Sequence, residues 1–320
     1  MKKQTQIETN PFPYSDTNKR YHTYDYYLRH QFGEKIAKIP LDAGMTCPNL
    51  DGKKGHGGCS FCAAGATDRA IDPTLTIEEQ YRLRLQSLRE KWKVTHTIPY
   101  LQAHTNTYAP TAELEKLYLR ALSLPGAVGL AIATRGDCLS PATARLLSKM
   151  GERKPVTVEL GLETACDATA ASLNRCESFA EFCRGYRLLR NAGNLRICIH
   201  LILGLPGENR ETVLNTIHRV SELQPDAVKF HLLYILRGTR LASEWESGKY
   251  TPLSKDEYIS LLCDCICALP PETVVERITG DAPRSELLAP LWSLRKREVL
   301  ASLDRRLFTY GLFQGKTYGK

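Results

Sequence analysis

Short apolar runs alternate with amphipathic helical patterns along most of this chain. Seven runs are rich in Val, Ile and Leu: 36–41, 97–103, 128–133, 156–162, 196–203, 227–235 and 274–278. Helical patterns follow at 76–92, 111–123, 141–150, 178–192, 210–223, 255–268 and 293–308. Strands of this composition, separated by helices, predict a parallel sheet with both faces covered. Regular succession of six such units favours an α/β fold, a partial (β/α)6 TIM-like barrel, over a doubly wound sheet.

The chain reads as one domain with extensions. No internal repeat, low-complexity tract or long linker divides its 320 residues. We predict a flexible N-terminal segment over 1–20, the barrel over 21–285 and a C-terminal helical extension over 286–320. Residues 21–34 carry five aromatic side chains. They predict either a segment docked on the barrel edge or a platform on which bases stack.

The composition indicates a globular protein of the reducing cytoplasm. Hydrophobic content of 42% and charged content of 24% are ordinary. Neither an apolar signal region nor a run of about 18 apolar residues is present, so we expect no membrane segment. The 11 cysteines are odd in number and irregular in spacing, which favours metal binding over disulfides. The net charge of +8 permits a polyanionic partner without requiring one.

Three cysteines lie in a glycine-rich loop directly after the first predicted strand. The loop reads CPNLDGKKGHGGCSFC and contains Cys47, Cys59 and Cys62. Its glycines allow the chain to fold back tightly, which would bring Cys47 to the close pair. Three converging thiolates suit zinc or an iron–sulfur cluster. For zinc, His56 could complete a Cys3His site.

Polar residues also follow or interrupt the other predicted strands. Glu159 and His200 lie inside apolar runs, and Lys229 and His231 lie inside the sixth run. An unpaired polar group is costly in such a position, although each could be a satisfied core residue. Because the carboxyl ends of barrel strands carry the chemistry in these folds, we expect these residues to line a polar site.

The loop and several further motifs resemble those of radical SAM (S-adenosylmethionine) enzymes. The gap of eleven residues between the first two cysteines is similar to the branch related to the Elongator catalytic subunit. The pattern CPN-x-DG-x-x-G-x-GG-C-x-FC of YhcC/YtqA-like members is matched more closely still. The likeness extends through QAHTNTYAP, ELGLET, LNR, HLILGLPGE, TGDAPR and APLWSLRK. It covers roughly residues 20–305 and implies a partial barrel of the radical SAM type.

This resemblance implies a ligand set and a reaction. Cys47, Cys59 and Cys62 would hold a [4Fe–4S] cluster whose open iron binds SAM. Reductive cleavage of SAM would give methionine and a 5′-deoxyadenosyl radical, which takes hydrogen from a substrate carbon. The substrate side would be faced by four residues: Glu159, His200, Lys229 and His231.

The resemblance assigns seven residues to SAM: Phe61, Asn106, Thr107, Glu163, Arg175, Leu203 and Pro206. Phe61 would help to seat the adenine, and the segment 203–206 would line it. Glu163 would bind the ribose or the methionine part, and Arg175 would face the carboxylate. Asn106 and Thr107 would lie near the amino group.

Relatives of this branch are linked to the C5 side chain of the tRNA wobble uridine. The leading prediction is therefore a tRNA-modifying enzyme, for which the basic helices 76–93 and 293–308 are suited. An electron donor such as flavodoxin or ferredoxin would be a partner. A small-molecule or peptide substrate is the alternative within the enzyme class. A zinc-structured nucleic-acid-binding protein and an electron-transfer protein are alternatives of other classes.

The remaining cysteines are given lesser roles. Cys263, Cys265 and Cys267 lie on a predicted helix, where positions i and i+2 point apart, so one metal cannot easily bind all three. We expect buried structural thiols there. Cys138, after the third strand, is a weaker candidate for a catalytic thiol.

Overall fold

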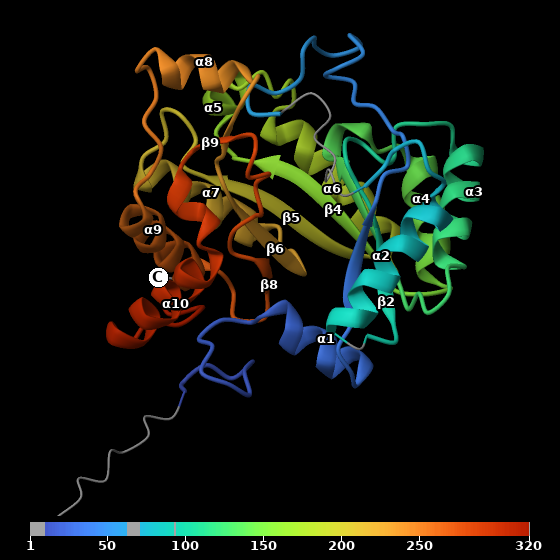
Figure 1. The fold of residues 1–320 in the computed structure, drawn as a ribbon, viewed down its shortest axis with the longest axis horizontal. Coiled ribbons are helices and arrows are strands. Elements are labelled where there is room, and N and C mark those ends of the chain that lie inside the picture. The colour runs from blue at the N-terminus through green and yellow to red at the C-terminus, as the bar shows by residue number, and fades with distance from the viewer. Residues whose placement is uncertain (1–9, 63–70, 93, 320) are drawn as a thin grey trace, which may run out of the picture.

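A curled, all-parallel sheet forms the centre of the molecule (Figure 1). The computed structural model describes residues 10–62, 71–92 and 94–319. The sheet order is β1-β2-β3-β4-β5-β6-β8, and every neighbouring pair is parallel. The strands are β1 (Ala37–Leu41), β2 (Thr97–Leu101), β3 (Leu130–Arg135), β4 (Val156–Glu163), β5 (Arg196–Leu203), β6 (Ala227–Leu232) and β8 (Val274–Arg277). The predicted parallel sheet is confirmed, and its seventh strand is the short run near residue 274.

Helices between the strands cover the outer face of the sheet. They are α2 (Ile77–Trp92), α3 (Thr111–Leu122), α4 (Pro141–Gly151), α6 (Phe179–Ala192), α7 (Arg210–Glu222) and α9 (Lys255–Ala268). Their starts follow from capping side chains: Ser140 accepts a hydrogen bond from the Thr143 N–H, and Asn209 accepts one from the Thr212 N–H. Such caps fix where each helix begins relative to the strand before it.

Alternation along each strand separates the core from the interior of the barrel. Ile39, Leu160 and Ile199 are fully buried against the covering helices. Their neighbours Lys38, Glu159 and His200 point to the opposite, concave face. We call the space inside that face the bore. The apolar core therefore lies outside the sheet, and the bore receives the polar side chains.

Smaller elements extend the barrel at both ends. They are α1 (Tyr24–Phe32), α5 (Asp167–Ser172), α8 (Arg240–Glu246), α10 (Lys296–Thr309), the strands β7 (Ile235–Leu236) and β9 (Leu287–Ala289), and the 3-10 turns Gly136–Cys138 and Leu291–Leu294. A helix was predicted at 293–308. It begins only at Lys296, because the 3-10 helix Leu291–Leu294 precedes it. No described helix is both long and apolar enough to cross a membrane.

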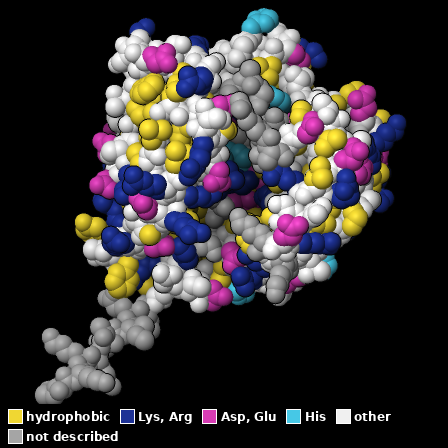
Figure 2. Space-filling view, viewed as in Figure 1, with side chains coloured by type: hydrophobic (Ala, Val, Ile, Leu, Met, Phe, Trp, Pro, Cys, Tyr) yellow, Lys and Arg dark blue, Asp and Glu magenta, His cyan; other side chains and the backbone are white. Residues whose placement is uncertain are grey.

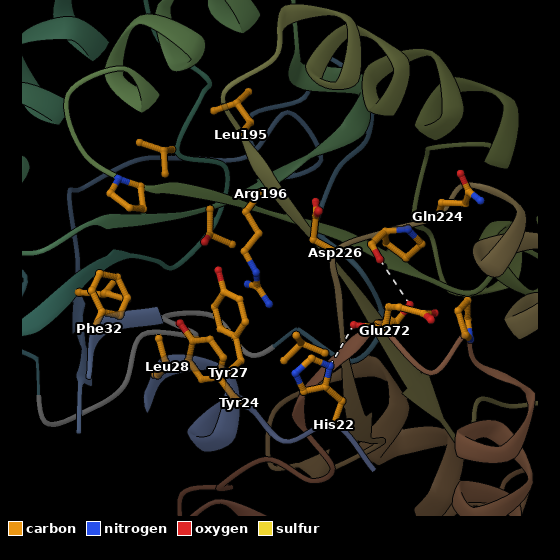
Figure 3. Close-up of a pocket in the computed structure, with 18 of the residues that line it drawn as sticks. His22, Tyr24, Tyr27, Leu28, Phe32, Leu195, Arg196, Gln224, Asp226 and Glu272 are labelled. Carbon is orange, nitrogen blue, oxygen red and sulfur yellow. Dashed lines mark hydrogen bonds between the residues drawn. The ribbon is translucent and has the colours of Figure 1, made fainter. Parts of the chain in front are cut away.

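Helix α1 crosses the amino ends of the strands and covers a cavity of about 690 Å³ (Figure 3). Tyr24 and Tyr27 stack on each other with ring centroids 6.1 Å apart. The Arg196 guanidinium lies 4.5 Å from the Tyr27 ring centroid. The aromatic segment 21–34 is thus docked on the barrel, which was the first of the two alternatives predicted for it. Whether its rings stack on bases stays a prediction.

Candidate active site

A second cavity, of about 670 Å³, lies at the carboxyl ends of the strands. The loop after β1 crosses this end of the molecule at the top of Figure 1, and Figure 2 shows a hollow with charged side chains around it. Many predicted site residues line this cavity: Cys47, Cys59, Cys62, Phe61, Glu159, Glu163, Arg175 and His200. Residues distant in sequence are therefore brought to one space, as the strand-end argument predicted.

The cysteine loop is folded by backbone hydrogen bonds and anchored on a distant segment. The Leu50 N–H donates to the Cys47 carbonyl over 2.8 Å, and the Cys62 N–H donates to the Cys59 carbonyl over 3.0 Å. The Asn174 side-chain amide donates to the Gly58 carbonyl over 2.8 Å. This anchoring holds the loop on the cavity wall, which a free glycine-rich loop could not maintain.

The Cys59 thiol lies in surroundings that favour negative charge. A hydrogen bond from the Cys62 thiol, together with the charges of Arg175 and Arg135, lowers the pKa of Cys59 to about 6. The Asn49 amide also lies 3.6 Å from the Cys59 Sγ atom. Thiolates are the form that binds metals. The pKa of Cys62 shifts the opposite way, well above its ordinary value, because of its hydrogen bond with Cys59 and its burial. A Cys59 thiolate beside fixed cations suits an anionic iron–sulfur cluster.

Within the described residues, no group of three side chains lies close enough together to hold an ion as it stands. The fit to a cluster rests instead on the donor set, because three thiols line one cavity. The cavity also has room for a further ligand. Five buried polar atoms on its wall have no hydrogen-bond partner among the described residues: Asn49 Oδ1, Ser60 Oγ, Thr105 Oγ1, Arg135 Nη1 and Arg175 Nε. Such atoms are costly unless a ligand or water satisfies them.

Two buried arginines form one side of this space. Arg135 donates two hydrogen bonds of 2.8 Å to the Asp137 carboxylate, which fixes its plane. Arg175 pairs with Glu177 over 2.9 Å and donates to the Gly161 carbonyl. Each guanidinium keeps one nitrogen without a partner. The pair could therefore hold a carboxylate such as that of an amino acid.

Glu163 lies at the end of β4 beside these arginines. Its backbone φ of 71° is in the left-handed region, which turns the side chain toward the cavity. Burial, with the nearby Cys59 and Glu177, raises the pKa of Glu163 to about 7 despite Arg175. A Cβ atom at Gly161 would lie 2.8 Å from Glu163 Oε1, so the glycine leaves room for this carboxyl. The group can act as a hydrogen-bond donor or acceptor near neutral pH.

Deeper in the bore, Glu159 is the centre of a charged network. It is completely buried and accepts hydrogen bonds from Lys38 at 2.6 Å, from His200 at 2.8 Å and from Lys229. Burial alone would raise the pKa of Glu159, but the two lysines hold it well below its ordinary value. Glu276 on β8 also binds Lys38, at 2.9 Å, so this lysine joins the two edge strands β1 and β8 across the bore.

Other predicted residues do not line the cavity. Asn106 is buried and its amide donates to the carbonyl groups of Ala103 and Ala133. Thr107 binds the Cys138 carbonyl over 2.8 Å. Leu203 is buried in the core, and Pro206 lies outside the lining. Lys229 and His231 reach the site through their neighbours, since Lys229 binds Glu159 and the His231 ring lies 5.1 Å from that of His200. All these role assignments stay predictions.

The structure adds residues to the site for which no role was assigned from the sequence. Lys38 and Glu276 complete the network around Glu159, and Arg135 and Asn49 line the cavity. A charged residue inside the apolar first strand was the available signal for Lys38. Cys138 does not line the cavity, and burial raises its pKa, which disfavours the thiolate. Three other thiols are buried in α9, as predicted: Cys263, Cys265 and Cys267.

Comparison with known proteins identifies the family. Residues 53–220 match the Radical SAM superfamily, and residues 225–308 match the Radical_SAM C-terminal domain. The chain belongs to the radical SAM superfamily. YtqA of Bacillus subtilis is 43% identical, over 98% of this chain and 97% of the relative. This confirms the predicted branch of radical SAM proteins.

Two more distant relatives extend the radical SAM comparison. The tRNA uridine(34) acetyltransferase of Methanocaldococcus jannaschii is 24% identical, over 82% of this chain and 54% of that protein. The solved structure of Elp3 from Methanocaldococcus infernus superposes with a TM-score of 0.64 at 18% identity, covering 87% of this chain and 64% of that one. The predicted partial barrel is thereby confirmed. As a radical SAM protein, the chain binds a [4Fe–4S] cluster and SAM.

Proposed function

We propose that this protein is a radical SAM enzyme that remodels the C5 side chain of the wobble uridine in tRNA. The observation that carries the enzyme part is the cavity at the carboxyl ends of the strands, where three thiols meet unpartnered arginine nitrogens. When bound, the cluster and SAM supply a 5′-deoxyadenosyl radical. We assign Cys47, Cys59 and Cys62 as the cluster ligands.

In this proposal, the chain's own residues bind and orient the reactants. The free nitrogens of Arg175 and Arg135 receive the SAM carboxylate, and Phe61 packs against the adenine on the same wall. Glu163 contributes a hydrogen bond to SAM. The bore beneath, around Glu159 and His200, takes the substrate. Because the cavity walls bury these groups, water is kept from the reacting atoms.

The tRNA part is supported by a relative and by charge. The relative from Methanocaldococcus jannaschii is named for uridine 34 of tRNA. The net charge of +8 suits a polyanion, and the protein would work in the cytoplasm with a donor such as flavodoxin or ferredoxin. The small-molecule or peptide alternative lacks such support.

The proposal is tested with anaerobically reconstituted protein, SAM, a reductant and tRNA from cells that lack this gene. Mass spectrometry of the tRNA nucleosides should show a changed wobble uridine that depends on SAM. The Cys59→Ala protein is the matched control and should leave the tRNA unchanged. If 5′-deoxyadenosine forms but no nucleoside changes, the RNA part is wrong and the radical chemistry stands.

A further inference from the structure

The bore contains more cationic than anionic side chains. Four cations reach it, Lys38, Arg196, Lys229 and Arg277, against two carboxylates, Glu159 and Glu276. Both carboxylates are fully occupied. Each of their four oxygen atoms already binds at least one lysine, arginine or histidine. Among the described residues of the bore, a positive charge is therefore left without a counter-charge.

This excess lies on the wall formed by β6 and β8. The register between these strands shifts at Lys229, so that β8 carries one extra residue there. In such a bulge, two consecutive residues oppose one residue of the partner strand and a side chain is re-aimed. Glu276 points into the bore, where it binds Lys38. The next residue, Arg277, is the register partner of Lys229, whose side chain binds Glu159 in the bore, so the two residues lie side by side on adjacent strands.

Two groups on this wall have hydrogen-bonding capacity to spare. The Nε2 atom of His231 is buried and has no partner among the described residues. The Arg277 side chain is exposed, and no hydrogen bond or ion pair to it is found in the described part of the chain. Lys229 lies two residues before His231 on the same face of β6 and opposite Arg277 in register. All three can act as donors.

Two buried histidines of this wall have cationic neighbours. Burial lowers the pKa of His231 well below its ordinary value, and His200, Arg277 and Lys229 lower it further. Burial also lowers the pKa of His200, with Lys229 adding to the effect and Glu159 opposing it. Burial disfavours charge of either sign, so the attraction for an anion comes from the cationic neighbours of His231, which are Arg277 and Lys229. Neutral imidazole and guanidinium donors suit an oxygen anion, and Arg binds carboxylate and phosphate with two parallel bonds.

We propose that the β6–β8 wall binds an anionic oxygen group of the substrate, a carboxylate or a phosphate, through Arg277 and His231. The inference rests on one part of the proposed function, namely that the substrate binds and reacts in this bore. It adds a requirement on the substrate, which must present a negative group close to the carbon that loses hydrogen. A neutral substrate that cannot accept or donate a hydrogen bond there would leave the buried His231 nitrogen unsatisfied.

The proposal is tested by isothermal titration calorimetry of the reconstituted protein with two monoanions. Acetate stands for a side-chain carboxylate, and dimethyl phosphate stands for the RNA backbone. Sodium chloride keeps the ionic strength constant. We expect at least one of the two to bind, and R277Q to weaken it about tenfold, which corresponds to about 1.4 kcal/mol. The matched control R284Q removes another exposed arginine of the same region and should change affinity less than twofold.

Each result has a definite meaning. Preference for acetate assigns the site to a carboxylate of the substrate, and preference for dimethyl phosphate assigns it to the backbone. Either supports the proposal. No binding of either anion overturns it, as does equal loss in R277Q and R284Q. H231Q should show the same loss, and R277Q remains informative if H231Q fails to fold, because Arg277 is exposed. The titration needs neither tRNA nor SAM cleavage, so its failure is distinct from failure of the proposed function.

Discussion

The two cavities at opposite ends of the sheet have nearly equal volumes, about 670 and 690 Å³, but very different walls. At the carboxyl ends, five buried polar atoms on the wall lack a partner among the described residues, whereas at the amino ends only one does, Arg196 Nη2. Two charged groups of the amino-end cavity are paired, since Asp226 binds Arg190 over 2.7 Å and Arg196 binds Glu276. Unsatisfied hydrogen-bonding capacity distinguishes the two ends better than volume does.

The strongest test of this comparison removes a thiol at the carboxyl end. Cys59→Ala should abolish both cluster assembly and 5′-deoxyadenosine formation, because two thiolates leave the cluster without its third protein ligand. Iron and sulfide analysis and a SAM cleavage assay measure both. Cys166→Ala, at a half-buried cysteine off the cavity, is the control and should retain the cluster. Retained SAM cleavage in the Cys59 variant would contradict the ligand assignment.

The next test concerns the bore between the two cavities. Glu159→Gln should lower the free energy of unfolding by about 3–5 kcal/mol, because Lys38 and Lys229 would lose their shared buried counter-charge. Urea denaturation measures this. Glu115→Gln breaks an exposed pair of 2.9 Å with Lys149 and should cost about 0.5 kcal/mol. Equal effects would mean that the network around Glu159 is not a stabilising one.

A pH series compares a histidine from each end. Burial lowers the pKa of His22, at the amino end, and lowers that of His231 further below its ordinary 6.5. Between the folded and the unfolded pKa, the unfolded chain binds the additional proton. The free energy of unfolding therefore falls as pH drops below 6.5, by up to about 1.4 kcal/mol per pH unit for each group.

His231→Asn should reduce the fall in the free energy of unfolding below pH 6.5 more than His22→Asn does. The groups that face His231 are His200 from β5, Lys229 from its own strand, Arg277 from β8 and Glu159 from β4. Urea unfolding at pH 7.5, 6.5 and 5.5 gives the two slopes. A steeper slope in the His231 variant would reverse the assigned direction of the shift.

The sequence predicted what depends on local pattern and failed where distant groups meet. The apolar runs predicted the strands, and the amphipathic patterns predicted the helices between them. The cysteine spacing and the interrupted runs at Glu159 and His200 pointed to the cavity, which those residues do line. The link from Lys38 to Glu276 depends on curling of the sheet, which no local pattern encodes.

Helix α1 shows a second limit of local pattern. Its helix was not predicted, and it is secured by the Thr23 cap and by packing on the strand ends. The register shift that places Arg277 opposite Lys229 depends likewise on the pairing of β6 with β8, which is a tertiary feature. Propensity alone is too weak to decide such cases.

The smallest expected effect is at the amino-end cavity. Tyr27→Leu removes a ring that stacks on Tyr24 and lies 4.5 Å from the Arg196 guanidinium, so it should cost about 1 kcal/mol of stability. SAM cleavage and the tRNA product should stay unchanged. Tyr26→Leu, on the same helix but off the cavity lining, is the matched control. If Tyr27→Leu weakens tRNA binding while Tyr26→Leu does not, the base-stacking hypothesis gains support, and the amino end is a second functional surface.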